Sequence, residues 1–398
     1  MNYNALLRPE VQNFIEINTL SKVSDLALKK NPFVDVEYTQ ILNQIVSRQK
    51  SKLKLPTWFS TKNIIYPSKI SIEQTSSESA AEYKSKIISG ESLIDLTGGF
   101  GIDDFYFAKS FQKVIHCELD NDLSAIVKHN YEQLKIKNIK CIAGDSLAIL
   151  NQLGQSFSWI YIDPSRRNDL KTKVFLLHDC LPNVPNLLFE YLRFTNNILV
   201  KTAPILDLKA GIKELIYVKK IHIIAIENEV KELLWEIEKN YVGPVKIATI
   251  NKTKGTIDAF NFILDDVTTS GTYSLPQQYI YEPNSAIMKS GGFNALGQQY
   301  NLRQLHQHSH LYTSATLSPF PGRVFEVVKN ISYCKQQMKL HLEKTKLNIT
   351  VRNFPETVEA IRKKWKMQEG GDDYCFFTTD QNNNKIVLIC KKISVLAH

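Results

Sequence analysis

The 398-residue sequence lacks several patterns that mark particular classes of protein. Its six cysteines are scattered without a CxxC pair, so neither a zinc site nor a disulfide framework is indicated. No window holds the roughly 20 apolar residues that a membrane span needs. Residues 1–16 also lack the apolar run of a signal peptide. We therefore expect a reduced, cytoplasmic protein without a membrane partner.

Composition and charge are those of a globular protein with a basic excess. Hydrophobic residues make up 43% of the chain and charged residues 22%, and the length exceeds that of one ordinary core. Two or three domains are expected. Lys and Arg number 49 against 40 acids, a net charge of +9. This excess suits a polyanionic partner, although a solvated basic surface would also explain it.

One stretch, Ser92-Leu-Ile-Asp-Leu-Thr-Gly-Gly-Phe-Gly101, organises the rest. Residues 92–96 have the apolar run of a buried parallel strand, the glycines form a turn, and residues 103–109 begin a helix. In a dinucleotide fold this turn faces a pyrophosphate, which Asp95 would repel. Asp95 therefore counts against NAD or ATP. It favours S-adenosylmethionine (SAM), which has no phosphate and carries an ammonium and a sulfonium group.

Two more carboxylates follow the next two predicted strands. Glu118 ends the strand at 113–118 and suits a bidentate bond to a ribose diol, with Asp120 as the alternative. Asp145, followed by Ser146, comes after the strand at 139–143 and would accept the adenine amino group. Ligands of parallel sheets bind at the carboxyl ends of the strands, so acids at three successive strand ends predict one cofactor site.

A hydroxyl-rich segment, residues 73–83, precedes the glycine turn. Ser76 or Ser77 would cap the helix that begins here. Because the segment lies just ahead of the turn, Gln74 and Ser76 are also candidates for contact with the methionine end of the cofactor.

The chemistry is predicted at Asp163, Pro164, Ser165 and Arg166, directly after a strand at 158–163. Proline fixes the backbone and removes a donor, which leaves a carbonyl and the Asp163 carboxylate as acceptors. Two acceptors on one side would hold a planar amino group whose nitrogen attacks a methyl group. The alternative is an ordinary Asp-Pro turn with Arg166 and Arg167 in salt bridges.

The remaining elements complete a parallel doubly wound sheet and a smaller C-terminal unit. Strands are expected at 197–202, 221–227 and 259–264, with a helix at 229–238, to close a seven-stranded sheet. His306, His308 and His310 have no carboxylate or thiol nearby in the sequence, so a metal site is disfavoured.

Cations gather in the C-terminal unit, where they would form a basic face for phosphates or a solvated surface. These residues are Arg323, Arg352, Arg362, Lys363, Lys364, Lys366, Lys391 and Lys392.

The motif 95–101, together with Glu118, Asp145 and residues 163–166, resembles the class I SAM-dependent methyltransferases over residues 70–265. A narrower resemblance, to bacterial methyltransferases with a C-terminal THUMP-like domain, reaches nearly the whole chain. Five segments carry it: 73–78, 163–167, 281–289, 320–325 and 352–355.

These resemblances imply an α/β protein with a Rossmann-like seven-stranded methyltransferase sheet. The implied parts are an N-terminal helical region (1–70), a methyltransferase domain (71–268), a small connecting ferredoxin-like subdomain (276–320) and a THUMP-like RNA-binding domain (321–398). The implied cofactor contacts are Gln74, Ser76, Asp95, Thr97, Gly99, Gly101, Glu118, Asp145 and Ser146. Asp163, Pro164, Ser165 and Arg166 would contact the target base.

Two departures from these families matter. Thr97 stands where many relatives have the first glycine, which is tolerable if the backbone there is not left-handed. Ser165-Arg166 replaces the Pro-aromatic pair of amino-methylating enzymes, so Arg166 would stack on the base or grip a phosphate instead.

The leading hypothesis is a SAM-dependent methyltransferase acting on a base nitrogen of tRNA or rRNA. The alternatives are a protein or small-molecule methyltransferase and a non-catalytic RNA-binding protein on a methyltransferase scaffold. A dinucleotide oxidoreductase is least favoured because of Asp95.

Overall fold

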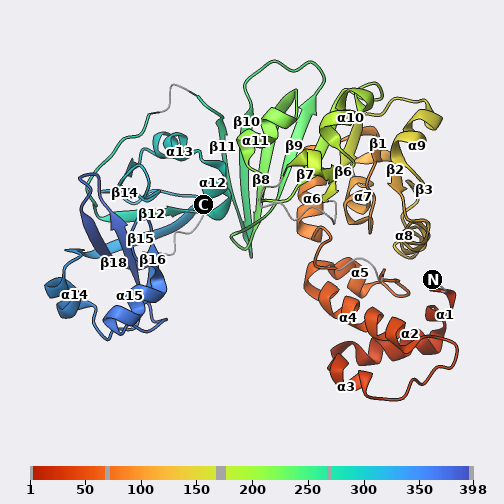
Figure 1. Cartoon of the computed structure of the whole chain (residues 1–398), viewed down its shortest axis with the longest axis horizontal. Coiled ribbons are helices and arrows are strands. Elements are labelled where there is room, and N and C mark those ends of the chain that lie inside the picture. Colours follow the sequence, from red (N-terminus) through yellow and green to blue (C-terminus); the bar gives the residue numbers. More distant parts are fainter. Residues whose placement is uncertain (1–2, 68–71, 167–175, 267–269, 394–398) are drawn as a thin grey trace. The chain divides into compact units, whose positions relative to one another are not determined.

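The computed structural model describes residues 3–67, 72–166, 176–266 and 270–393 (Figure 1). The chain divides into two compact units. The first contains Met1–Lys219 and Leu234–Val242, and the second contains Lys220–Leu233 and Gly243–His398. None of the helices in the described ranges is long and apolar enough to cross a bilayer.

The N-terminal region is helical, as the resemblance implies. Ile41 and Ile45, one turn apart, are both fully buried against the other helices of this region. The elements are α1 (Tyr3–Leu6), α2 (Pro9–Ile17), a 3₁₀ turn (Asn18–Leu20), α3 (Val23–Ala27), α4 (Tyr38–Lys54) and α5 (Pro56–Ser60).

Parallel strands form the part of the larger sheet that lies in the first unit. Four of these strands have buried apolar runs, as expected for strands covered by helices, whereas β3 at the edge of the sheet is only partly buried. In spatial order the strands are β7 (Asn197–Thr202), β4 (Trp159–Ile162), β1 (Gly90–Asp95), β2 (Phe111–Glu118) and β3 (Ile139–Ala143).

Helices alternate with these strands, which confirms the predicted α/β class. They are α6 (Glu78–Ile87), α7 (Ile102–Phe107), α8 (Asn121–Gln133), α9 (Ser146–Leu153), α10 (Val184–Tyr191) and α11 (Leu208–Glu214), with a 3₁₀ turn at Leu177–Asp179. A two-stranded ribbon, β5 (Ser165–Arg166) and β6 (Cys180–Leu181), follows β4.

Within the described residues the larger sheet has nine strands rather than the expected seven. Its order is β11-β10-β8-β9-β7-β4-β1-β2-β3. The four remaining strands are β8 (Val218–Ile226), β9 (Glu229–Glu238), β10 (Lys246–Thr253) and β11 (Thr256–Ile263). The sequence analysis missed β10, which pairs with β11 across the two-residue turn Lys254-Gly255. Gly255 has φ +91°, a conformation that favours glycine.

The prediction of a helix at 229–238 is wrong, because this segment is β9. Glu227 and Asn228, with φ values of +50° and +60°, form a tight turn that leads back into β9. The run Leu233-Leu234-Trp235 is fully buried, and the Trp235 indole donates a 2.9 Å hydrogen bond to Thr202 Oγ1. A strand that is buried on both faces lacks the alternation of apolar and polar residues by which a strand is recognised in a sequence.

A second sheet lies in the second unit. Its order is β13-β14-β12-β15-β18-β17-β16, and the strands are β12 (Tyr279–Pro283), β13 (Arg303–Gln304), β14 (Tyr312–Ser314), β15 (Gly322–Ser332), β16 (Asn348–Val351), β17 (Asp373–Thr379) and β18 (Lys385–Ile393). The helices are α12 (Ser285–Ser290), α13 (Phe293–Gln299), α14 (Lys335–His341) and α15 (Val358–Trp365).

Candidate active site

The turn between β1 and α7 depends on its glycines. Gly99 and Gly101 have φ values of +56° and +77°, a region that favours glycine. Gly98 has no room for a side chain, because a Cβ there would lie 2.2 Å from the His116 ring. The turn is therefore closely packed on its His116 side.

Thr97 joins the ends of β1 and β4. Its backbone N–H and its hydroxyl both donate to Asp95 Oδ1, at 2.8 and 3.0 Å. The same hydroxyl accepts a 2.7 Å hydrogen bond from the backbone N–H of Asp163. Thr97 is not left-handed, so threonine is tolerated where relatives have glycine.

The Asp95 carboxyl lies inside the protein rather than on the open side of the turn. The residue is 2% exposed, and burial, together with the nearby Asp104, raises the pKa of its carboxyl group. Asp95 therefore holds the turn through Thr97. The negative charge that a cationic ligand would meet must come mainly from other acids.

Glu118 is the more accessible of these acids. It is partly exposed at the end of β2, and its two oxygens accept hydrogen bonds from the backbone N–H groups of Gly99, at 2.9 Å, and Asp120, at 2.8 Å. The Asp120 side chain caps α8 by accepting from Asp122 and Leu123. Between the two candidates for ribose binding, Glu118 is thus the one attached to the glycine turn.

Asp145 lies at the same sheet edge. Register pairs Asp95 with His116 and Glu118 with Ala143, so the three acids follow the carboxyl ends of three neighbouring parallel strands. Asp145 is exposed, and its carboxylate caps α9 by accepting a 2.8 Å hydrogen bond from Ala148. Ser146 is the first residue of α9.

Ser76 and Ser77, in the hydroxyl-rich segment before α6, make different contacts. Ser77 is the cap of this helix, since its side chain accepts from Ala80 N. Gln74 is exposed in a turn. The Ser76 hydroxyl instead donates to Asp103 and accepts from Lys84, both at 2.9 Å.

Lys84 and Asp103 form a buried ion pair that the sequence analysis missed. The two groups are 2.8 Å apart, and the Lys84 side chain is fully buried. Tyr161, on β4, also donates to Asp103, at 2.8 Å. Burial alone would raise the pKa of the Asp103 carboxyl, but the positive charges of Lys84 and Lys201 outweigh it and lower this pKa. The pair links α6, α7 and β4 directly behind the predicted site.

Asp163 follows β4 and is ion-paired with Lys201 on β7. The Asp163 side chain is 37% exposed, so it is open to a ligand, whereas Pro164 is buried. Ser165 and Arg166 form β5, and Arg167 lies outside the described residues. Lys201 was not predicted as a site residue. The sequence does place it, with Thr202, at the end of the apolar strand predicted at 197–202, which is the edge where ligands bind.

His116 and Asp104 lie fully buried beneath the turn, with His116 Nδ1 2.7 Å from Asp104 Oδ2. Burial favours the uncharged forms. It lowers the pKa of the imidazole and, together with Asp103, raises the pKa of the Asp104 carboxyl. An uncharged pair can thus support the turn without a solvated counter-charge.

This histidine predicts a pH dependence of stability. Below its ordinary pKa of 6.5 the unfolded chain takes up a proton that folded His116 does not. The contribution of His116 to stability should therefore fall as the pH drops from about 7 to about 5, the range in which an ordinary histidine titrates. The raised pKa values of Asp95 and Asp104 act in the opposite direction, so the effect is the difference between wild type and a variant without the imidazole. Thermal unfolding of wild type and His116→Gln across this range measures the effect. An identical slope for the two proteins would contradict it.

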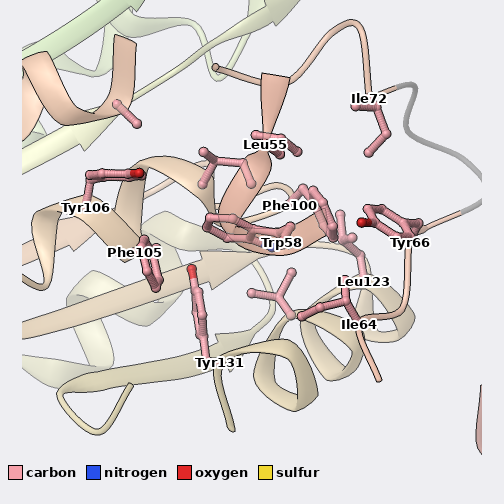
Figure 2. Close-up of a cluster of buried hydrophobic side chains, with 13 residues drawn as sticks. Leu55, Trp58, Ile64, Tyr66, Ile72, Phe100, Phe105, Tyr106, Leu123 and Tyr131 are labelled. Carbon is pink, nitrogen blue, oxygen red and sulfur yellow. The ribbon is translucent and has the colours of Figure 1, made fainter. Parts of the chain in front are cut away.

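The N-terminal region packs against the same turn from outside (Figure 2). Phe100, inside the turn, lies 6.4 Å from the Trp58 ring and 6.0 Å from the Tyr66 ring. Trp58 also makes an edge contact of 4.8 Å with Phe105 on α7. The helices before the sheet thus help to fix the turn.

Gly101→Ala tests how tightly the turn is packed. A Cβ at Gly101 would lie 2.1 Å from the Tyr131 hydroxyl, which donates to Gly101 O. Left-handed strain and overpacking together should lower the free energy of unfolding by about 2–4 kcal/mol. Gly154→Ala is the matched control, because Gly154 has φ +56° but its nearest Cβ neighbour would be 3.9 Å away. Equal urea midpoints for the two variants would refute the packing argument.

The predicted basic face of the second unit is partly neutralised. Arg362 pairs with Glu369 at 3.0 Å and Lys364 with Glu356 at 2.9 Å. Arg323 and Arg352 both bind the buried Glu282. Four of the eight cations of the predicted face are thus paired with acids, whereas Lys363, Lys366, Lys391 and Lys392 are exposed.

The three histidines considered for a metal lie in a turn rather than on a strand. The His306 ring contacts the side-chain amides of Asn383, at 3.1 Å, and Asn353, at 3.0 Å. These contacts tie the turn to the β17–β18 connection and to the segment that follows β16. The described residues contain no group of three or more His, Cys, Asp or Glu that could hold a metal ion.

Comparison with known proteins identifies the C-terminal regions. Residues 279–321 match a family described as a ferredoxin-like domain, and residues 322–392 match one described as THUMP domain-like. A crystal structure from Porphyromonas gingivalis W83, described as a "putative methyltransferase", is 29% identical with a TM-score of 0.88. The match covers 99% of this chain and 100% of that one. No curated protein matches.

Other solved structures match the sheet domain more weakly. An rRNA methylase from Streptococcus thermophilus is 14% identical, covering 40% of this chain and 94% of its own, with a TM-score of 0.30. A tRNA m1G37 methyltransferase from M. jannaschii is 13% identical, covering 42% and 51%, with a TM-score of 0.29. These scores are too low to support an argument about this chain.

Proposed function

We propose that this chain, which joins a methyltransferase-like region to ferredoxin-like and THUMP-like domains, transfers a methyl group from SAM to a base nitrogen of tRNA or rRNA. One observation carries the proposal. The glycine turn, Glu118 and Asp163 meet at the carboxyl edge of the parallel strands, tied together through Thr97 and Gly99. This edge is where ligands of such sheets bind.

The residues at this edge fit a cationic, phosphate-free cofactor. Gly99 is open, since a Cβ there would meet only Thr97 O, at 3.6 Å. Glu118 is partly exposed beside it and accepts from the Gly99 N–H. A carboxylate thus occupies the place where a phosphate would bind the N–H groups of the turn. Glu118 would bind the ribose hydroxyls, and Asp145 the adenine amino group.

Asp163 is the proposed acceptor for the amino group of the target base. When bound, SAM supplies a methyl group whose bond to sulfur breaks, with the electron pair left on sulfur, as nitrogen attacks. Asp163 orients that nitrogen by accepting a hydrogen bond from its N–H, and Lys201 holds the carboxylate in place through their ion pair. The nitrogen then releases its extra proton to water or to Asp163.

An RNA substrate is supported by the C-terminal half of the chain. Residues 322–392 are THUMP-like, and the whole chain carries a net charge of +9. Ser165 and Arg166 follow Asp163 and Pro164, where they would contact the target nucleotide. An RNA substrate also fits the cytoplasmic location that the sequence predicts.

The test is methyl transfer by the purified full-length protein. Tritiated SAM is supplied with total RNA from a strain that lacks this gene, and with protein extract and DNA from the same strain. Label should enter RNA alone, and mass spectrometry of nucleosides should show one N-methylated base that the strain itself lacks. Label that enters only the protein extract, or no acceptor at all, would overturn the proposal.

A further inference from the structure

A groove of about 1090 Å³ lies in the second unit and has no part in the proposed methyl transfer. Its lining residues all belong to this unit. The groove is lined in part by three of the segments that resemble methyltransferases with a THUMP-like domain, namely 281–289, 320–325 and 352–355. The β10–β11 hairpin forms another part of the lining.

A buried glutamate holds two arginines in this groove. Glu282 is 3% exposed, and it accepts hydrogen bonds from Arg323 Nε at 2.7 Å and Arg352 Nη2 at 3.0 Å. One carboxylate faces two guanidinium groups, so the cluster keeps a net positive charge. Because the carboxylate fixes their planes, both arginines are preorganised for an incoming anion.

These arginines keep donors for a ligand. A guanidinium group has five N–H donors, and Glu282 takes only some of them. Arg352 Nε is buried and has no hydrogen-bond partner among the described residues. A buried donor without a partner is costly, so it indicates a group that a ligand would satisfy. Lys392, exposed in the same lining, adds a third cation.

Aromatic and amide groups line the groove beside the cations. The Tyr300 and Phe320 rings meet edge to face at 5.8 Å. The Asn251 side chain interacts with Asp258, whose carboxyl pKa is nevertheless raised by burial, and Asn284 Nδ2 is buried without a hydrogen-bond partner among the described residues. Rings for stacking and amides for base edges are the groups that proteins use to bind unpaired nucleotides.

We infer that this groove binds a phosphate and an adjoining base of a single-stranded RNA segment, with Arg323 and Arg352 on the phosphate. Arginine forks match the paired oxygens of a phosphate, and the aromatic and amide lining matches a base better than it matches an acidic peptide. The inference rests on the proposed function for the identity of the ligand as RNA. The arginine cluster itself does not depend on methyl transfer.

The test is fluorescence anisotropy of the full-length protein with a fluorescein-labelled, mixed-sequence, single-stranded 10-mer oligoribonucleotide. Arg352→Gln should raise Kd about tenfold, as expected for a lost hydrogen bond to a charged group. It should also lower the slope of log Kd against log salt by about one. Arg362→Gln is the matched control, because this arginine on α15 pairs with Glu369 and does not line the groove.

A second variant guards against misfolding. Lys392→Gln changes an exposed side chain and should raise Kd about threefold, since it removes one phosphate contact. Effects of Arg352→Gln and Lys392→Gln no larger than that of Arg362→Gln would overturn the inference. Competition by 5′-AMP only at far higher concentration supports RNA, whereas AMP that binds as tightly as the oligonucleotide overturns it.

Calorimetry with SAM separates the two proposals. The Arg352→Gln variant should bind SAM as wild type does, because Arg352 belongs to the second unit and the proposed SAM site belongs to the first. If wild type binds RNA through these arginines but never binds SAM, the proposed function fails and the groove remains. If SAM binds and the variants leave RNA binding unchanged, only the groove inference fails.

Discussion

Asp163→Asn should lower kcat for methyl transfer to RNA by about 10²–10⁴-fold, the range lost with a positioned proton-accepting side chain. Asp163 is the exposed acid at the end of β4, and its charge is paired with Lys201. Asparagine keeps the shape but loses the charge and presents an amide that can repel the amino group. The backbone bond from residue 163 to Thr97 should survive.

The substitution should leave SAM affinity within about threefold of wild type, because Glu118 and the glycine turn are untouched. A loss confined to the chemical step indicates an interaction made only in the transition state. Single-turnover rates with tritiated SAM, and a separate calorimetric titration, measure the two effects. Asp25→Asn, in α3 of the N-terminal region, is the matched control and should change neither. A full rate for Asp163→Asn would remove Asp163 from the mechanism.

Glu118→Gln should weaken SAM binding by at least about tenfold, the cost of losing hydrogen bonds to a charged group. The carboxylate accepts from the Gly99 and Asp120 backbones, and it remains partly exposed for the ribose hydroxyls. Glutamine loses the charge and turns one acceptor into a donor that faces a backbone N–H. The ligand contact and the support of the turn are both reduced.

Glu132→Gln makes the same chemical change at an exposed position on α8 and should leave SAM affinity unchanged. Thermal midpoints of both variants show whether Glu118→Gln also loosens the fold. If Glu118→Gln binds SAM as tightly as wild type does, Glu118 has no role in the cofactor site.

The parallel core of the fold was predictable because its signals are local. Each strand from β1 to β4 is a short apolar run that ends at an acid or glycine, and α8 and α9 each follow a capping aspartate. The carboxyl ends of parallel strands share one edge, so Asp95, Glu118 and Asp145 could be placed together without a structure.

What failed depends on contacts between distant segments. β9 looks helical in sequence, and only the turn at Glu227 and Asn228 and the packing of Trp235 make it a strand. Lys201 and Asp163 are 38 residues apart, and no local pattern pairs them.

Asp95 changes the electrostatic argument most. From the sequence alone, the charge of Asp95 is expected to attract the cofactor. In the structure the Asp95 carboxyl is buried and hydrogen-bonded to Thr97, and burial raises its pKa. Attraction of a cationic ligand then depends chiefly on Glu118. Exclusion of a pyrophosphate depends on the same side chain, because the Glu118 carboxylate already accepts from the Gly99 N–H of the turn.

Calorimetric titration of the wild-type protein with SAM, and in parallel with NAD⁺, tests this cofactor site most directly. SAM should give a saturable heat of binding, and NAD⁺ should give none at concentrations that saturate with SAM. Saturable binding of NAD⁺ at this edge, or no heat with SAM, would contradict a site built from carboxylates for a phosphate-free cation.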